Sequence, residues 1–99
     1  MYTKKMISGD TMEILLSGKF DAVSAPEFDQ EMEGQLAGIT KVIMDLGAVE
    51  YISSAGLRSI LSVQTLLDEV QGQVVVRNVP EIVQKIFDVT GFSGLVTIE

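Results

Sequence analysis

The chain has 99 residues, of which 14 are acidic and 7 are basic, so its formal net charge at pH 7 is −7. It contains neither cysteine nor histidine, which excludes disulfide bonds, Cys/His zinc sites and any mechanism with either residue as nucleophile or base. The length predicts a single domain over residues 1–99 that buries one hydrophobic core without help from a metal or cofactor.

The acidic side chains cluster in one segment that contains no basic residue: Asp21, Glu27, Asp29, Glu31 and Glu33. Nucleic acids and anionic membranes bind basic surfaces, so neither is an expected partner. A basic protein partner fits the charge, and so does an acidic surface that only keeps the protein soluble. No apolar run approaches a membrane span and the first residues do not resemble a secretory signal, so we expect a cytosolic protein.

The first part of the chain predicts a β-hairpin. The strand-like segments Tyr2–Ile7 and Met12–Ser17 are separated by Ser8-Gly9-Asp10, a typical glycine-containing turn. A second turn, Gly18-Lys19-Phe20-Asp21, follows the hairpin.

A helix is then expected to begin at Ser24. The segment Ser24-Ala25-Pro26-Glu27 fits a capping box in which Ser24 is the N-cap and Glu27 is the third helical residue. Apolar residues follow at helical spacing and predict one buried stripe: Ala25, Phe28, Met32 and Leu36. Gly38 is the expected end of this helix.

The middle of the chain predicts a strand followed by a long helix. Lys41–Leu46 is a short, nearly continuous apolar run, which is typical of a strand buried on both faces. From Ser54 to about Gly72, helical spacing predicts a broad buried face formed by Leu57, Ile60, Leu61, Val63, Leu66, Leu67 and Val70.

The last part repeats this alternation. Val74–Arg77 predicts a strand, Asn78-Val79-Pro80-Glu81 predicts another capped helix that ends at Gly91, and Leu95–Ile98 predicts a final strand. The inward residues of that helix are expected to be Val79, Ile82, Val83, Ile86 and Phe87. The order β-β-α-β-α-β-α-β predicts an α/β fold: a small mixed sheet whose later strands are parallel and joined by right-handed crossovers, with helices packed against it.

The junction at Ser53 and Ser54 is the candidate functional site. If Ser54 is the N-cap, the first turn of the following helix carries no carboxylate, and its free N–H groups suit a phosphoryl group on Ser54. Gly56 would leave room for that group. An ordinary N-cap at either serine explains the same pattern.

Several segments together resemble the STAS family, which contains the bacterial anti-sigma factor antagonists. These segments are Gly18-Lys19-Phe20-Asp21, Met44-Asp45-Leu46, Tyr51-Ile52-Ser53-Ser54-Ala55-Gly56-Leu57 and Ile86-Phe87-Asp88-Val89-Thr90-Gly91-Phe92. The resemblance extends over the whole chain. It implies the STAS fold and an antagonist that acts by partner switching.

In this family the serine two residues before the motif glycine is the phosphorylation site, which implies Ser54 here, with Ser53 as the second choice. The resemblance implies that the unmodified antagonist binds an anti-sigma factor that is also a serine kinase and thereby frees a sigma factor. Phosphorylation ends this binding and a serine phosphatase restores it. The residues expected at the interface are Asp21, Ser53, Ser54, Ala55, Gly56 and Arg58.

Other readings stay open at this point. The family often has Asp before its acceptor and Ser or Thr after it, whereas this chain has Ser53 and Ala55. The main alternative is a STAS docking subunit of a transport or signalling complex that does not switch. Weak nucleotide binding is a third possibility, although the chain has no P-loop.

Single residues of the candidate interface also have simpler explanations: Arg58 fits a solvated charge, and Asp21 fits a turn cap. Catalysis by Ser54 is not expected, because the chain has no histidine to act as base and no lysine in a recognisable Ser/Lys motif. A monomer is favoured.

Overall fold

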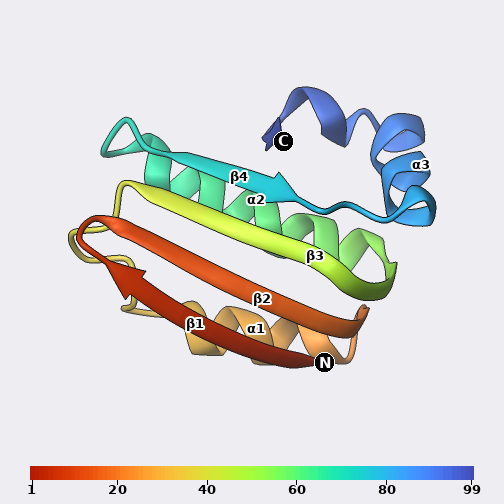
Figure 1. Ribbon diagram of the computed structural model, residues 1–99, viewed down its shortest axis with the longest axis horizontal. Coiled ribbons are helices and arrows are strands. Elements are labelled where there is room, and N and C mark those ends of the chain that lie inside the picture. The colour runs from red at the N-terminus through yellow and green to blue at the C-terminus, as the bar shows by residue number, and fades with distance from the viewer.

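Five strands form one mixed sheet in the structure, which is a computed structural model and describes residues 1–99 (Figure 1). The strands are β1 (Tyr2–Ser8), β2 (Thr11–Phe20), β3 (Lys41–Ile52), β4 (Gln73–Arg77) and β5 (Thr97–Ile98), and they lie side by side in that order. β1 is antiparallel to β2, and all other neighbouring pairs are parallel. The predicted α/β fold and element order are therefore confirmed.

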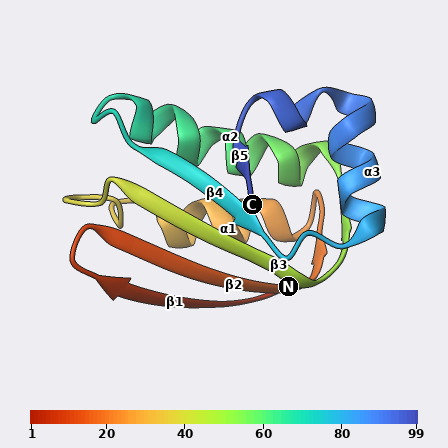
Figure 2. The same ribbon diagram turned by 45° about the horizontal axis from the view of Figure 1, so that its top comes forward.

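Three α-helices connect the parallel strands: α1 (Ser24–Met32), α2 (Ser54–Asp68) and α3 (Glu81–Thr90). A short 3-10 helix, Phe92–Gly94, precedes β5, which begins later than predicted. Figures 1 and 2 show α1 and α2 on the same face of the sheet, with α3 beyond the end of β4. The core is thus a single layer between the sheet and the helices, and the opposite face of the sheet carries no helix.

The burial of β3 shows this one-sided arrangement. Val42, Met44 and Leu46 are fully buried under the helices, whereas Ile43 and Asp45 are only partly buried on the other face. The prediction of a strand buried on both faces was therefore wrong. Aromatic pairs fill the ends of the core: the rings of Phe20 and Phe28 meet edge to face with centroids 5.1 Å apart, and those of Phe87 and Phe92 are 4.9 Å apart. Each fully buried side chain of this size contributes about 2–3 kcal/mol to folding.

β3 is also longer than predicted, because it continues past two irregularities to Ile52. Leu15 pairs with Asp45, but Ser17 pairs with Ala48, so β3 has one extra residue between these two pairs. A second shift lies further along the same pair of strands. Bulges of this kind bend a strand and increase its twist. The bent part of β3 leads directly to the start of α2.

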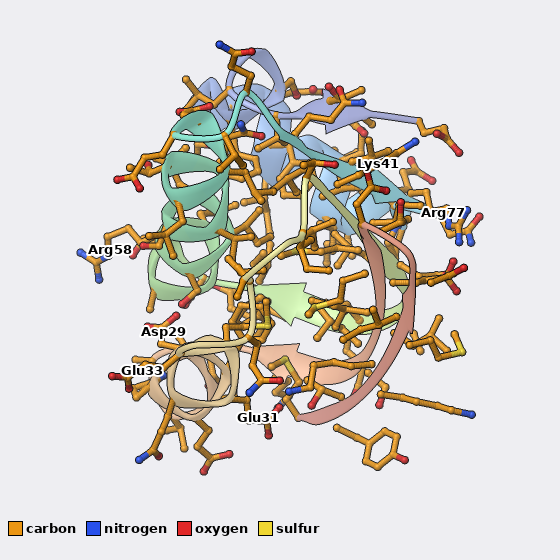
Figure 3. The ribbon with its side chains drawn as sticks, turned by 90° about the vertical axis from the view of Figure 1, so that its left-hand side faces the viewer. Asp29, Glu31, Glu33, Lys41, Arg58 and Arg77 are labelled. Carbon is orange, nitrogen blue, oxygen red and sulfur yellow. The ribbon has the colours of Figure 1, made fainter.

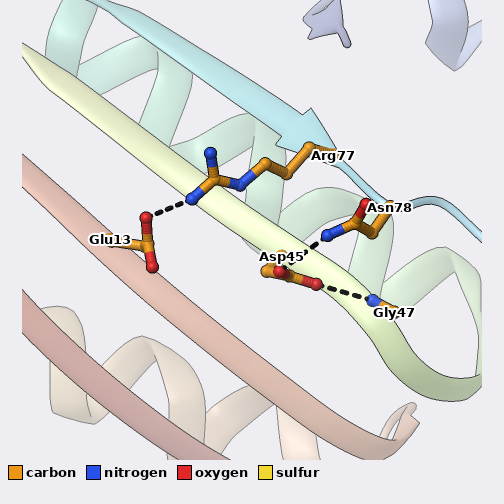
Figure 4. Close-up of polar contacts among 5 residues, drawn as sticks. All are labelled: Glu13, Asp45, Gly47, Arg77 and Asn78. Atoms are coloured by element: carbon orange, nitrogen blue, oxygen red, sulfur yellow. Dashed lines mark hydrogen bonds and ion pairs between the residues drawn. The ribbon is translucent and has the colours of Figure 1, made fainter.

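The Asp45 carboxylate fixes the first bulge. It accepts the backbone N–H of Gly47 at 2.9 Å and the side-chain amide of Asn78 at 2.9 Å (Figure 4). Asn78 has φ +55° and is held here, so it does not cap α3, whose N-cap is Pro80. The same figure shows Arg77 paired with Glu13 across β3.

Two helices end differently from the prediction. α1 ends at Met32 rather than at Gly38. After α2 the residue in the left-handed conformation is Gln71, with φ +58°, and the N–H of Gly72 donates to the Leu67 carbonyl at 2.8 Å. Gly72 instead permits a close approach, because a Cβ atom there would lie 2.3 Å from the carbonyl oxygen of Thr40.

The buried faces of the helices are narrower than predicted. Leu66 and Val70 on the α2 side, and Ile82 on α3, are 52%, 54% and 54% exposed. Leu66 and Val70 line a surface pocket together with residues of the segment after α1, including Leu36 and Ile39. They therefore belong to the surface available for contact with other molecules.

Candidate functional site

The candidate site is the first turn of α2. Ser53, with φ −100° and ψ 176°, is the N-cap, and Ser54 is the first helical residue. The first intrahelical hydrogen bond runs from the N–H of Leu57 to the Ser53 carbonyl at 3.0 Å. Of the two serines that the sequence left open as N-cap, the structure selects Ser53, and the third helical position is therefore Gly56.

The two serine hydroxyls have opposite environments. The Ser53 side chain makes no capping hydrogen bond, and its Oγ is enclosed by the protein without any partner. Ser54 is exposed. Ser54 is therefore accessible to a modifying enzyme, whereas the Ser53 hydroxyl is enclosed.

The helix start beside Ser54 is unoccupied by any protein acceptor. The backbone N–H groups of Ser54, Ala55 and Gly56 donate no hydrogen bond within the chain, and the first turn contains no acidic residue. These donors, together with the positive end of the helix dipole, make the turn favourable for an anion.

Phe20, the last residue of β2, positions this turn. Its carbonyl oxygen accepts the N–H of Ser53 at 2.9 Å. Gly56 packs directly over it: a Cβ atom at that position would lie 2.6 Å from the Phe20 oxygen and 2.8 Å from the Ile52 side chain. Gly56 is buried and faces the core, so it does not leave room for a phosphate as predicted but lets α2 approach β2.

Asp21 follows Phe20 and caps the start of α1. One carboxylate oxygen accepts the N–H groups of Val23 at 3.0 Å and Ser24 at 3.1 Å. Hydrogen bonds from the Ser24 and then the Val23 backbone, helped by the Ser24 hydroxyl and the charge of Lys19, hold the Asp21 pKa below its ordinary value of 3.8. Asp21 is therefore ionised at neutral pH.

The predicted capping box at Ser24 was wrong in its details. Ser24 is buried inside the first turn, where its hydroxyl donates to the Lys19 carbonyl at 2.7 Å and accepts the N–H of Asp21 at 2.9 Å. Asp21 thus acts as the turn cap that the sequence left as one of two possibilities. The turn directly follows Phe20, whose carbonyl oxygen accepts the N–H of Ser53, so the backbone links the Asp21 turn to the start of α2.

Two further side chains on these elements are exposed. Arg58 is exposed on α2, forms no ion pair and points into solvent in Figure 3. Val23 is 78% exposed in the loop before α1. Sequence analysis did not single out Val23, and its only signal was an apolar residue beside the acidic turn. The candidate site at the start of α2 therefore combines the exposed Ser54, the free amides of the first turn and the exposed Arg58.

Other kinds of site have no counterpart in the structure. No group of three or more carboxylates is placed to hold a metal ion. No helix combines the length and the apolar character that a membrane crossing requires.

Comparison with known proteins gives a consistent assignment. The sequence matches the STAS domain family over residues 2–99. It is 36% identical over 81 residues to BtrV of Bordetella bronchiseptica, a protein inferred to be an anti-sigma factor antagonist; the match covers 81% of this chain and 70% of BtrV. It is 26% identical over 91 residues to the anti-sigma-B factor antagonist of Listeria monocytogenes, covering 91% of this chain and 80% of that protein.

Solved structures share the fold. Unphosphorylated SpoIIAA, an anti-sigma factor antagonist, superposes with a TM-score of 0.78 at 18% identity, covering 99% of this chain and 87% of SpoIIAA. The phosphorylated form of SpoIIAA from Bacillus gives a TM-score of 0.76 at 18% identity, with coverages of 99% and 91%. An anti-sigma factor antagonist from Mycobacterium paratuberculosis gives 0.85 at 22% identity, with coverages of 98% and 83%. The chain therefore belongs to the STAS-domain family of anti-sigma factor antagonists, whose members are regulators rather than enzymes.

Proposed function

We propose that this chain works by partner switching in the cytosol, with Ser54 as the switch. In the unmodified form it binds an anti-sigma factor that is also a serine kinase, and the sigma factor held by that protein is released. The observation that carries the proposal is the exposed hydroxyl of Ser54 at the start of α2, next to the enclosed hydroxyl of Ser53. We place the interface on Asp21, Ala55 and Arg58 around this hydroxyl.

The covalent step is a phosphoryl transfer from ATP. The Ser54 oxygen forms a bond to the γ-phosphorus, the bond to the β-phosphate oxygen breaks, ADP leaves and the hydroxyl proton passes to a base of the kinase. A serine phosphatase reverses the modification by hydrolysis, in which water replaces the Ser54 oxygen on phosphorus and inorganic phosphate leaves. No residue of this chain acts as a catalyst in either step.

Electrostatics explains how one phosphate can end binding without unfolding the protein. The ester adds about 1.5 to 2 negative charges to a chain whose net charge is already −7. The free N–H groups of Ser54, Ala55 and Gly56 stabilise part of this charge at the helix start. A partner covering the site would still have to desolvate a dianion on a surface that already carries the ionised carboxylate of Asp21, which is strongly unfavourable.

The known pair of SpoIIAA structures supports the idea that phosphorylation leaves the fold intact. This chain superposes almost equally well on the unphosphorylated and the phosphorylated forms, with TM-scores of 0.78 and 0.76. A STAS docking subunit that does not switch remains the alternative function. It differs in one respect that can be measured, because it requires no phosphate on Ser54.

Peptide mass spectrometry of the protein purified from its native cells tests the proposal. We expect a phosphate on the peptide containing residues 53 and 54, with fragment ions that place it on Ser54. The kinase is then purified from extracts of the same cells by following phosphate transfer from ATP to the wild-type chain, with Ser54→Ala as the negative control. Absence of the phosphate under all growth conditions, together with no transfer in extracts, would leave the docking subunit as the function.

A further inference from the structure

A groove separates α1 from α2 on the side of the molecule away from the sheet. It has a volume of about 550 Å³, and the residues that line it include Pro26, Asp29 and Glu33 on one side and Ser59, Ser62 and Leu66 on the other. An extension of about 270 Å³ shares Asp29 and Ser59 and runs to Ala55 and Arg58. The groove is therefore continuous with the turn that carries Ser54.

Ser59 is the unusual residue of this groove. It is only 3% exposed, yet its hydroxyl takes part in no hydrogen bond, whereas Ser62 and Thr65 on the same helix donate to the carbonyls of Arg58 and Leu61. The one unpaired side-chain oxygen that is completely enclosed is that of Ser53. The Ser59 oxygen therefore keeps a narrow access, and the groove that it lines provides it. A buried hydroxyl without a protein partner is destabilising unless water or a ligand in the groove supplies one.

The charges of the groove are also unbalanced. Asp29 and Glu33 form no ion pair, because the ion pairs of the structure are Arg77 with Glu13 and Lys85 with Glu81. Arg58 lies at the mouth of the extension but points away into solvent, while Asp29 lies on the side of α1 that faces α2 (Figure 3). Arg58 is thus the one cation that lines the groove or its extension, and it forms no ion pair with Asp29 or Glu33.

We propose that this groove receives an arginine side chain of the anti-sigma factor that docks over Ser54. The guanidinium group has five N–H donors in a planar arrangement and no acceptor, so it can bind a carboxylate of Asp29 or Glu33 while it donates to the Ser59 oxygen. The methylene stem of an arginine packs well on apolar walls such as Leu66 and Met32. The occupant is thus defined by charge, hydrogen bonding and shape together.

This inference rests on the proposed function, since it names a second contact of the same partner. The charge on Ser54 would decide whether the partner can bind. The groove would add affinity for the partner and fix its position on the surface. A partner that covers Ala55 already stands at the mouth of the groove, because Ala55 lines its extension.

The test is a calorimetric titration of the purified kinase with matched variants of this chain. Asp29→Lys should weaken binding about tenfold or more, because a cation replaces the carboxylate that faces the arginine. The control is Glu31→Lys, which makes the same charge change two residues along α1 on an exposed residue that faces Thr3 of β1. It should change the affinity less than threefold. Ser59→Ala should weaken binding about threefold to tenfold while the far-UV spectrum stays that of wild type.

A compensating variant identifies the arginine. Replacing the correct arginine of the kinase by glutamate should weaken binding to wild type and restore binding to Asp29→Lys. Equal affinities of Asp29→Lys and Glu31→Lys, with Ser54→Asp still unable to bind, would overturn the groove and leave the switch intact. If the wild-type chain binds no kinase, the proposed function and this inference both fail.

Discussion

The N–H of Ser53 donates to the carbonyl oxygen of Phe20 at 2.9 Å, and this bond joins the end of β2 to the start of α2. The turn that caps α1 follows Phe20 directly, so one backbone contact aligns the Asp21 turn and the Ser54 turn. Gly56 lies over the same carbonyl oxygen, and because glycine has no side chain, α2 can approach the end of β2 at this point. The geometry of the candidate site therefore depends on packing at least as much as on the polar residues of the motif.

Gly56→Ala should destabilise the protein by about 1–3 kcal/mol in urea unfolding, because the new Cβ atom would lie 2.6 Å from the Phe20 oxygen. This loss should outweigh the gain of about 1 kcal/mol that alanine normally brings to a helix. Gly94→Ala is the matched control, since nothing lies within 4 Å of its Cβ position, and it should stay within about 0.5 kcal/mol of wild type. A Gly56→Ala protein as stable as wild type would disprove this packing role.

Ser53→Ala should leave the free energy of unfolding within about 0.5 kcal/mol of wild type or raise it slightly, since the enclosed Oγ has no partner to lose. A working N-cap serine would instead cost about 1 kcal/mol on removal. Ser24→Ala is the control with the same chemistry. It removes hydrogen bonds to Lys19 and Asp21 at 2.7 and 2.9 Å and should cost about 1–3 kcal/mol. Equal losses in the two variants would show that Ser53 caps α2 after all.

The Asp21 cap should make stability depend on pH in the acid range. Its pKa is lower in the folded protein than the ordinary value of 3.8, because the amides of Ser24 and Val23 bind the ionised form. A lowered folded pKa means that the stabilisation is complete above 3.8 and is lost as the pH falls through the lower, folded pKa. Above pH 5 the urea midpoint of wild type should exceed that of Asp21→Asn, and the difference should shrink below pH 4. A difference that stays constant down to pH 2 would contradict the charge-dependent cap.

The sequence predicted the elements and their order well, because strands and helices differ clearly in hydrophobic period. Its errors came from tertiary contacts. The local sequence at Ser24 fits a capping box, but in the structure the Asp21 carboxylate accepts the N–H of Ser24. The Ser24 hydroxyl donates instead to the carbonyl of Lys19. Leu66 follows the helical period and is nevertheless exposed, because α1 ends at Met32 and leaves the groove open above it.

Asp45→Ala should cost about 1–2 kcal/mol, because it removes the acceptor for the Gly47 amide and for the Asn78 side chain. Hydrogen exchange is the sharper measurement, since the Gly47 amide should exchange faster in Asp45→Ala than in wild type. Asp45→Asn keeps one oxygen for Gly47 and should protect that amide better than Asp45→Ala does. Identical exchange in all three proteins would mean that the bulge does not need the carboxylate.

The sequence could single out a candidate site but could not predict its local geometry. The motif pointed to the Ser53–Gly56 turn, yet spacing alone could not show that Ser53 is enclosed and Ser54 exposed, because both flank the same helix boundary. The groove with its unpaired Ser59 was not predictable either. The groove depends on how far apart α1 and α2 pack, and no sequence pattern within one helix encodes the distance between two helices.

We propose that a phosphate on Ser54 prevents the anti-sigma factor kinase from binding while the fold is retained. The most direct measurement is calorimetric titration of the purified kinase with unmodified chain and with chain phosphorylated on Ser54. We predict binding of the unmodified form, at least about a hundredfold weaker binding of the phosphorylated form, and superimposable far-UV spectra. Equal affinity of the two forms for the kinase would contradict the account.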